Sequence, residues 1–200
     1  MKNRTRIVYA IDVDSNRRPD TRVSRAEQSA AAQRLLERLA GDARPKIVWS
    51  KSHSRAGIAV AVGDGDGIFL GVDLEWIAAN RSYQAIARDL LGDDAGDIGA
   101  TDFYRLWTFY EAYFKAFQRT PHRDLLREIV TRAAGPSTCR LSDGTRVLQR
   151  SAPPGFQLCL VWSDTHDSEI APYCAEDAEP NAGAADGAQA LPIDTLNAGD

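Results

Sequence analysis

Residues 68–76 read IFLGVDLEW, and this alternating stretch decides how the rest of the chain is interpreted. Side chains of an extended strand point alternately to opposite faces, so Asp73 and Glu75 share one face. Val72 and Leu74 share the other face. Two carboxylates on one face of an otherwise apolar strand are costly to bury unless a cation joins them. The stretch therefore predicts a strand with one packed face and a pair of acids on the other.

The acidic pair has two interpretations at this point. Carboxylate oxygens in this number suit Mg²⁺, which usually keeps water molecules and substrate phosphates in its coordination shell. The alternative is that Asp73 and Glu75 lie on an exposed, solvated edge of an antiparallel sheet. The residues of this strand alone leave both interpretations open.

The hydrophobic pattern before this strand predicts a strand, a helix and two further strands. Ser24 followed by Glu27 is a capping-box sequence, with a serine N-cap and a glutamate three positions later. The Ala- and Leu-rich helix that it opens is expected to stop at Gly41. The predicted strands span residues 7–13, 47–50 and 58–62.

The pattern after this strand predicts three helices and then two strand regions. Thr101 is expected to cap the longest helix, in which apolar side chains recur at helical spacing and predict one apolar face. These side chains are Phe103, Leu106, Trp107, Tyr110, Phe114 and Phe117. The other helices are expected at 82–91 and from Thr120-Pro121 to about Gly135, and the strand regions at 139–148, with an Asp143-Gly144 turn, and at 155–162.

The order of these elements indicates an α+β protein built from two similar halves. A strand, a helix and two strands in the first half are followed by a strand, helices and two strands in the second. Halves of this kind meet at a surface where ligands commonly bind. We predict an N-terminal half over residues 1–66, a C-terminal half over 67–163, and an acidic, disordered tail over 164–200.

The composition favours a soluble protein that binds an anionic ligand or an acidic partner. Of the 200 residues 44% are hydrophobic, and no apolar run approaches the roughly 20 residues that span a bilayer. All 24 Lys and Arg residues precede residue 151, against 19 Asp and Glu residues, so this part carries a charge of 24 − 19 = +5. This bias is too weak to indicate nucleic-acid binding. We expect a cytoplasmic protein with no nucleic-acid or membrane partner.

Two further clusters could carry chemistry. Glu111 and Lys115 are four residues apart in the predicted long helix, so they share a helix face. They form either an ordinary surface ion pair or a pair of functional groups. Ser52 and His53 lie in a polar segment, residues 50–54, that is expected to connect two short strands. A histidine in such a connection is either solvated or a ligand contact.

Together, SHS at 52–54, GVDLE at 71–75 and WTFYEAYFK at 107–115 resemble the signature of the 4′-phosphopantetheinyl transferases. The resemblance is to the longer, surfactin-type, pseudo-dimeric group, covers about residues 25–162 and is strongest over 50–116. In that family two α+β halves related by pseudo-two-fold symmetry bind coenzyme A between them. The resemblance implies transfer of the 4′-phosphopantetheine group of coenzyme A to a serine of an apo acyl or peptidyl carrier protein, with release of 3′,5′-ADP.

The resemblance also implies roles for individual residues in a monomeric holo-acyl-carrier-protein synthase. Asp73, Glu75 and Glu111 would hold Mg²⁺ together with the coenzyme A diphosphate. Lys115 would contact the phosphate during catalysis and binding, and Glu111 would accept the proton of the carrier serine, directly or through water. The residues expected at the 3′-phosphate end of coenzyme A are Ser52, His53 and Arg25.

The chain departs from the family pattern at positions that bear on substrate range. Tyr110 stands before the helix glutamate, where the family usually has lysine, and it is expected to pack on the apolar face of the helix. Lys51 adds a cation to a strand end that is otherwise apolar. We expect Lys51 to contribute a phosphate contact.

Two other functions stay open from the sequence. A catalytically degenerate relative would bind carrier protein or coenzyme A without transferring the arm, although all three carboxylates and Lys115 are retained. A different Mg²⁺-dependent phosphoryl enzyme would turn over phosphate monoesters instead. In a transferase or in a degenerate relative that binds carrier protein, the basic body of the protein would attract the acidic helix of the carrier.

Overall fold

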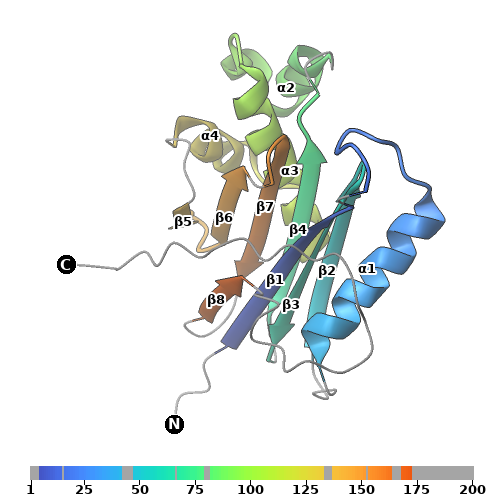
Figure 1. Ribbon diagram of the computed structural model, residues 1–200. Coiled ribbons are helices and arrows are strands. Elements are labelled where there is room, and N and C mark those ends of the chain that lie inside the picture. The colour runs from blue at the N-terminus through green and yellow to red at the C-terminus, as the bar shows by residue number, and fades with distance from the viewer. Residues whose placement is uncertain are drawn as a thin grey trace.

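Two four-stranded β-sheets and four α-helices make up the part of the chain that the computed structural model describes (Figure 1). That part comprises residues 5–14, 16–41, 47–65, 67–78, 82–132, 137–151, 153–163 and 168–172. No helix within these ranges is long and apolar enough to cross a membrane. In chain order the elements are β1 (Thr5–Val13), α1 (Arg25–Ala40), β2 (Ile47–Ser54), β3 (Gly57–Asp64), β4 (Phe69–Trp76), α2 (Tyr83–Leu91), the short 3-10 helix η1 (Gly92–Ala95), α3 (Ala100–Phe117), α4 (Arg123–Thr131), β5 (Ser137–Arg140), β6 (Arg146–Ser151), β7 (Phe156–Ser163) and β8 (Ser168–Pro172).

Three strands of each sheet share an order. The first is ordered β2-β3-β1-β8 and the second β4-β7-β6-β5. Matching β1, β2 and β3 in chain order to β4, β6 and β7 gives the same arrangement twice, with the third strand between the other two. In both sheets this central strand is antiparallel to its two neighbours. The expected α+β class is therefore confirmed.

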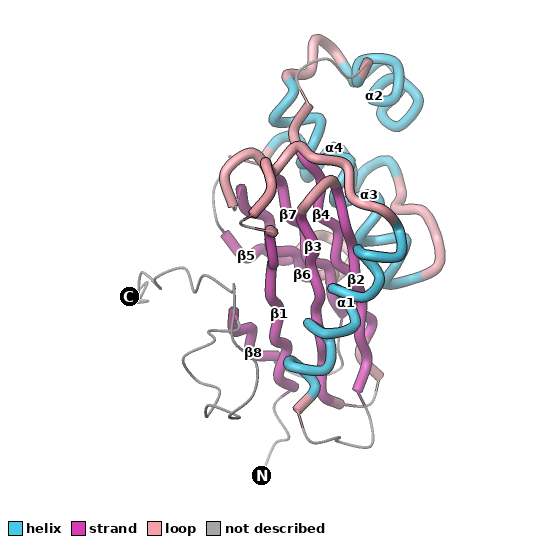
Figure 2. The backbone as a smooth tube through the Cα atoms, turned by 45° about the vertical axis from the view of Figure 1, so that its right-hand side comes forward, coloured by secondary structure: helices cyan, strands magenta, loops and turns pink. Residues whose placement is uncertain are grey.

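The sheets pack face to face, and helices cover their outer faces (Figures 1 and 2). Ile7 and Ala59 from the first sheet meet Val72, Leu74 and Leu158 from the second in a core between the sheets. Helix α1 covers the other face of β1 and β3. Helices α2, α3 and α4 cover the other face of the second sheet. The acidic face of β4 is thus turned toward α3, because its apolar face fills the core between the sheets.

Helix α1 begins with the predicted capping box. The Ser24 hydroxyl accepts a hydrogen bond from the backbone amide of Glu27, and the Glu27 carboxylate accepts one from the backbone amide of Ser24. Gly41 ends the helix with a positive φ of 57°, a backbone conformation that glycine adopts without steric cost. This start makes Arg25 the first residue of α1.

Helix α3 differs from its prediction at its start and in its buried face. Gly99 is the N-cap, so Thr101 lies inside the first turn. Phe103 is buried as expected, but Phe114 is 43% exposed. Ala112 is fully buried, and its backbone lies against Gly71 of β4. The buried face of α3 is therefore rotated about the helix axis relative to the predicted apolar face. Residue spacing alone does not show how closely a strand approaches the helix.

Helix α4 begins later than predicted. Its first residue is Arg123, and His122 caps it by accepting a hydrogen bond from a backbone amide, whereas the start was expected at Thr120-Pro121. The helix ends at Thr131. The expected end near Gly135 lies outside the described residues.

Strand β2 is longer than predicted. Residues 50–54 continue the strand in register with β3 and do not form a connection between two strands. Their burial alternates, with Ser50 and Ser52 buried and Lys51 and His53 exposed. The polar segment therefore presents hydroxyl groups to one side and ionisable groups to the other.

Strand β8 lies in the region that we expected to be a disordered tail. Residues 168–172 pair in parallel with residues 5–9 of β1. The expectation of disorder is wrong for these five residues, because the free edge of β1 offers backbone partners that composition does not show. Residues 164–167 and 173–200 lie outside the described part of the chain.

Gly71 allows α3 to lie directly on β4. A Cβ atom added at Gly71 would be 1.9 Å from the carbonyl oxygen of Ala112 and 2.8 Å from the backbone nitrogen of Ala116. Both atoms belong to the helix backbone, which cannot rotate away as a side chain can. The contact fixes the height of α3 above the acidic face of β4.

Gly71→Ala should lower the free energy of unfolding by about 3 kcal/mol or more, since overfilling a packed site commonly costs 1–3 kcal/mol and here the obstacle is backbone. Gly99→Ala is the matched control, because a Cβ there meets no atom within 4 Å. The control should change stability by less than about 1 kcal/mol. Urea denaturation of both variants measures the difference, and equal losses would contradict the close approach.

Removal of residues 168–200 should destabilise the protein by on the order of 2 kcal/mol relative to removal of residues 173–200. The longer deletion takes away the strand that pairs with residues 5–9 of β1 and leaves its backbone groups without partners. Denaturation curves of the two shortened chains provide the measurement. Identical midpoints would show that β8 adds no stability.

Candidate functional site

β2 and β4 are neighbouring edge strands of the two sheets, and serine side chains join them. The hydroxyl of Ser50 accepts a hydrogen bond from the backbone amide of Val72 at 3.0 Å. The hydroxyl of Ser54 accepts one from the backbone amide of Trp76 at 3.0 Å. An edge strand has backbone N–H groups without a strand partner, and a buried N–H without an acceptor is costly. The serines of β2 therefore stabilise the edge that carries the predicted acids.

Asp73 is the deepest of the predicted acids, at 4% exposure. Its Oδ1 atom accepts hydrogen bonds from the Ser52 hydroxyl and from the Lys115 ammonium, each at 2.8 Å. Lys115 also donates to the carbonyl oxygen of Val72 at 3.0 Å. The other carboxylate oxygen, Oδ2, is buried and has no hydrogen-bond partner. Buried polar atoms are normally paired, so this oxygen marks a place for a cation or a donor from a ligand.

Glu75 points toward α3, on the same side of β4 as the other acid. The Ser54 hydroxyl donates a hydrogen bond to its Oε2 atom at 2.9 Å, and Trp107 Nε1 donates to Oε1 at 3.2 Å. The Trp107 indole is stacked between Phe103 and Tyr110, with ring centroids 6.3 Å and 5.9 Å away. The stack holds the indole N–H toward the carboxylate. Tyr110 thus packs against an aromatic neighbour.

Glu111 is partly buried and lies on α3 between two residues that contact the acids. Trp107 is four residues before it and Lys115 four residues after it, so all three share one helix face. Trp107 contacts Glu75 and Lys115 contacts Asp73, which turns this face toward the acidic side of β4. Within the described ranges, however, no three His, Cys, Asp or Glu side chains lie close enough to form a metal centre by themselves. The three predicted carboxylates are therefore not assembled into a ready-made cluster.

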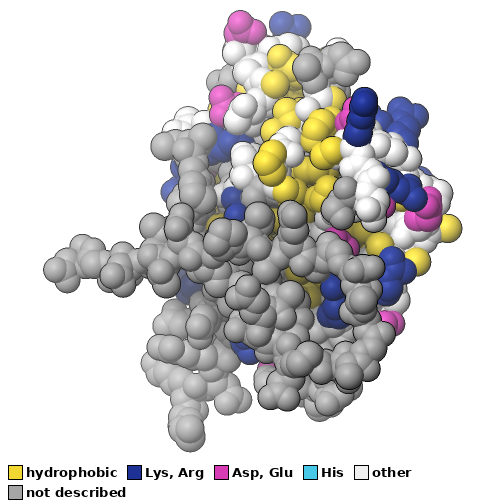
Figure 3. Space-filling view, viewed as in Figure 1, with side chains coloured by type: hydrophobic (Ala, Val, Ile, Leu, Met, Phe, Trp, Pro, Cys, Tyr) yellow, Lys and Arg dark blue, Asp and Glu magenta, His cyan; other side chains and the backbone are white. Residues whose placement is uncertain are grey.

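Positive charge gathers around His53 on the exposed side of β2. The pKa of His53 lies below its usual value of 6.5, chiefly because the ring is desolvated. The charges of Lys115, Lys51 and Arg25 lower this pKa further, while a backbone hydrogen bond opposes them. Arg25 comes from the first turn of α1 and Lys115 from α3. Figure 3 shows Lys and Arg side chains on the side of the molecule where α1 lies.

The donors fit a Mg²⁺ ion that is completed by substrate oxygens. Such ions are usually bound through one or two carboxylates together with phosphate and water, not inside an all-protein cage. Oδ2 of Asp73 is the clearest available ligand atom, since it is buried without a partner. Ser54 and Trp107 each donate one hydrogen bond to the Glu75 carboxylate, and a carboxylate has about four acceptor sites in all. A preassembled trio of carboxylates is not required for this kind of site.

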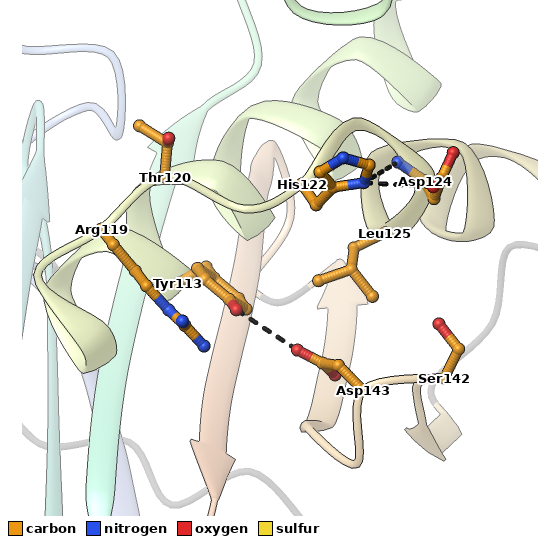
Figure 4. Close-up of a pocket in the computed structure, with 8 residues that line it drawn as sticks. All are labelled: Tyr113, Arg119, Thr120, His122, Asp124, Leu125, Ser142 and Asp143. Atoms are coloured by element: carbon orange, nitrogen blue, oxygen red, sulfur yellow. Dashed lines mark hydrogen bonds and ion pairs between the residues drawn. The ribbon is translucent and has the colours of Figure 1, made fainter.

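A surface pocket of about 400 Å³ lies elsewhere, between the end of α3, the start of α4 and the β5–β6 turn (Figure 4). No predicted site residue lines it. Three of its polar side chains already have hydrogen-bond partners. The Tyr113 hydroxyl donates to Asp143, Asp143 accepts from Thr145, and His122 accepts from the backbone amide of Asp124. The pocket is therefore separate from the acidic face of β4.

Sequence reasoning missed three residues that organise the site. Ser50 accepts a hydrogen bond from the backbone of β4, and Ser54 and Trp107 each donate one to the Glu75 carboxylate. The alternating serines at 50, 52 and 54 were a usable signal, because alternate residues of a strand share a face. The polar stretch was instead interpreted as a connection between strands. Ser52, expected near a phosphate, donates its hydroxyl to Asp73.

Lys51→Gln should raise the pKa of His53, because it removes one of the cations that disfavour the protonated ring. Arg34→Gln makes the same charge change on an exposed part of α1 and should leave this pKa unchanged. Proton NMR titration of the imidazole, assigned with His53→Gln, provides the measurement. The folded-state pKa lies below that of the unfolded chain, so His53 contributes stability above about pH 6.5 that is lost as the pH falls toward the folded-state pKa. A rise in both charge variants would contradict the local cation group.

No protein-family model matches the chain, and a search of curated protein sequences gives no significant match. The function is therefore inferred from the motifs and from the geometry of one region, the β2–β4–α3 region. This region comprises the serine seam, which is Ser50, Ser52 and Ser54 of β2 with their hydrogen bonds to β4, and the acids of β4. It also includes the Trp107–Lys115 face of α3 and the cations around His53.

Proposed function

We propose that this protein is a Mg²⁺-dependent 4′-phosphopantetheinyl transferase that acts on an apo acyl or peptidyl carrier protein. The observation that carries the proposal is the arrangement at Asp73. Its buried carboxylate binds Ser52 and Lys115 through one oxygen and leaves the other without a partner. The motifs from β2, β4 and α3 that resemble the family signature thus adjoin one another through these contacts.

Coenzyme A carries negative charge at two places, the diphosphate and the 3′-phosphate. The β2–β4–α3 region offers complementary groups for both. Lys115 and a cation at the open oxygen of Asp73 would meet the diphosphate. His53, Arg25 and Lys51 form the positively charged surroundings suited to the 3′-phosphate. The positive charge of Lys115 acts on both groups of residues, since it pairs with Asp73 and also lowers the pKa of His53.

Asp73, Glu75 and Glu111 would hold the Mg²⁺ ion together with the diphosphate. Bound there, Mg²⁺ would supply charge neutralisation for the phosphate oxygens as the leaving group departs. Ser52 and Trp107 orient the first two carboxylates by donating hydrogen bonds to them. Residues that orient ligand carboxylates in this way commonly tune the metal site.

Glu111 is the proposed general base. It accepts the proton of the carrier serine, whose oxygen then forms a bond to the β-phosphorus of coenzyme A. The bond from that phosphorus to the bridging oxygen breaks, and 3′,5′-ADP leaves with the electron pair. Lys115 stabilises the negative charge that develops on the leaving group. A carboxylate in this role commonly contributes a factor of 10²–10⁴ to the rate.

The direct test incubates the protein with coenzyme A, Mg²⁺ and several purified apo carrier proteins. Mass spectrometry of the carrier should show a gain equal to one phosphopantetheine group, and the gain should depend on Mg²⁺. Mutation of the acceptor serine of the carrier should abolish it. Absence of the added mass on every carrier, with folded enzyme, would refute the proposed reaction.

Glu111→Gln should reduce the transfer rate by about 10²–10⁴-fold, because the amide cannot accept the serine proton. The fold should persist, as the substitution keeps the size of the side chain. Glu37→Gln, an exposed glutamate on α1, is the matched control and should retain the normal rate. Single-turnover measurements with a saturating carrier separate this effect from binding. A normal rate in Glu111→Gln would remove this residue from the mechanism.

The second candidate is a module that binds coenzyme A or a carrier protein without transferring the arm. The observation in its favour is that both oxygens of Glu75 already accept hydrogen bonds, and that the described residues hold no ready-made metal cluster. This candidate predicts binding of coenzyme A that does not depend on Mg²⁺, with no change in carrier mass. The transfer assay distinguishes the two.

A further inference from the structure

The exposed side of β2 carries an aromatic ring and two ionisable groups in a row. Trp49, Lys51 and His53 occupy alternate positions of the strand and are all exposed, while Ser50 and Ser52 between them are buried. The three outward side chains therefore share one face. With a rise of about 3.3 Å per residue, Trp49 and His53 lie roughly 13 Å apart along the strand.

Trp49 is unusual for its exposure. At 46% it is one of three large apolar side chains that are exposed within the described residues. The Lys51 ammonium lies 5.8 Å from the centre of its ring. Among the described ion pairs, none joins Lys51 or Arg25 to a carboxylate. An exposed indole thus stands in one row with Lys51 and His53 on β2, and within the described ion pairs neither Lys51 nor the nearby Arg25 of α1 has an acidic partner.

An aromatic ring next to phosphate-binding cations is a common arrangement for nucleotides. A base stacks on the ring through its π-face, while the phosphates contact the cations. The spacing along β2 suits a single nucleotide, with its base at Trp49 and its phosphate near Lys51 and His53. Nonspecific single-stranded nucleic acids instead use successive aromatic platforms along a strongly basic groove. The face of β2 offers one such ring.

We propose that Trp49 is a stacking platform for the purine base of a 3′-phosphorylated adenine nucleotide, whose phosphate is bound by Lys51, His53 and Arg25. The inference rests on the proposed function, in which coenzyme A supplies that nucleotide. It assigns a specificity role to Trp49 and a binding role to Lys51.

The test compares two probes, 3′,5′-ADP and base-free ribose 3,5-bisphosphate, by calorimetry. Trp49→Leu should weaken binding of 3′,5′-ADP by about 5- to 150-fold, the range for loss of one stacked base. Binding of the base-free probe should not change. Trp49→Phe keeps an aromatic face and should retain binding of 3′,5′-ADP within a few-fold. Lys51→Gln should weaken both probes alike, since it removes a phosphate contact.

Several outcomes would overturn the inference. Equal binding of 3′,5′-ADP by the native protein and Trp49→Leu, with native circular dichroism, would exclude stacking. A single-stranded oligonucleotide that binds far more tightly than the mononucleotide would identify a different ligand class. If Trp49→Leu lost binding of both probes, the indole would have a structural role and would not be a stacking platform.

The same measurements separate this inference from the transferase proposal. Binding of 3′,5′-ADP that depends on Trp49, with no transfer to any carrier, would support the nucleotide site and refute the reaction. Transfer with an unchanged KM for coenzyme A in Trp49→Leu would support the reaction and refute the platform.

Discussion

The contact between Gly71 and the backbone of α3 controls how the β2–β4–α3 region is built. Without a side chain at this position, the helix lies directly on the acidic face of β4. At this height Lys115 reaches the Asp73 carboxylate and Trp107 reaches the Glu75 carboxylate. A bulkier residue would lift the helix and separate the two sets of groups. One small residue therefore determines whether charged side chains from two distant segments can interact.

The electrostatics of the region follow from this packing. Burying a carboxylate is unfavourable unless a counter-charge or donor stabilises it. Asp73 has both, through Lys115 and Ser52, on one oxygen alone. The uneven pairing leaves a buried acceptor that a divalent cation could use. Lys115, which pairs with Asp73, also belongs to the group of cations around His53, so the acidic and the basic parts of the region adjoin at this lysine.

The sequence predicted local features well and contacts between distant segments poorly. Alternation placed Asp73 and Glu75 on one face of a strand, because side-chain direction is a property of the backbone itself. The capping box likewise depends on residues three apart. The serine seam of β2 and the exposure of Phe114 depend on how whole elements dock. No short window of sequence contains that information.

Pairing of β8 with β1 places the last described segment beside the first. During synthesis on the ribosome, β1, β2 and β3 emerge long before residues 168–172. The first sheet therefore waits, with one edge of β1 uncovered, until the strands and helices of the second sheet have been made. Domains commonly begin to fold in this order, and a nascent chain with an uncovered strand can pair with another chain. Closure of this edge is thus a late event that must follow the emergence of residues 168–172.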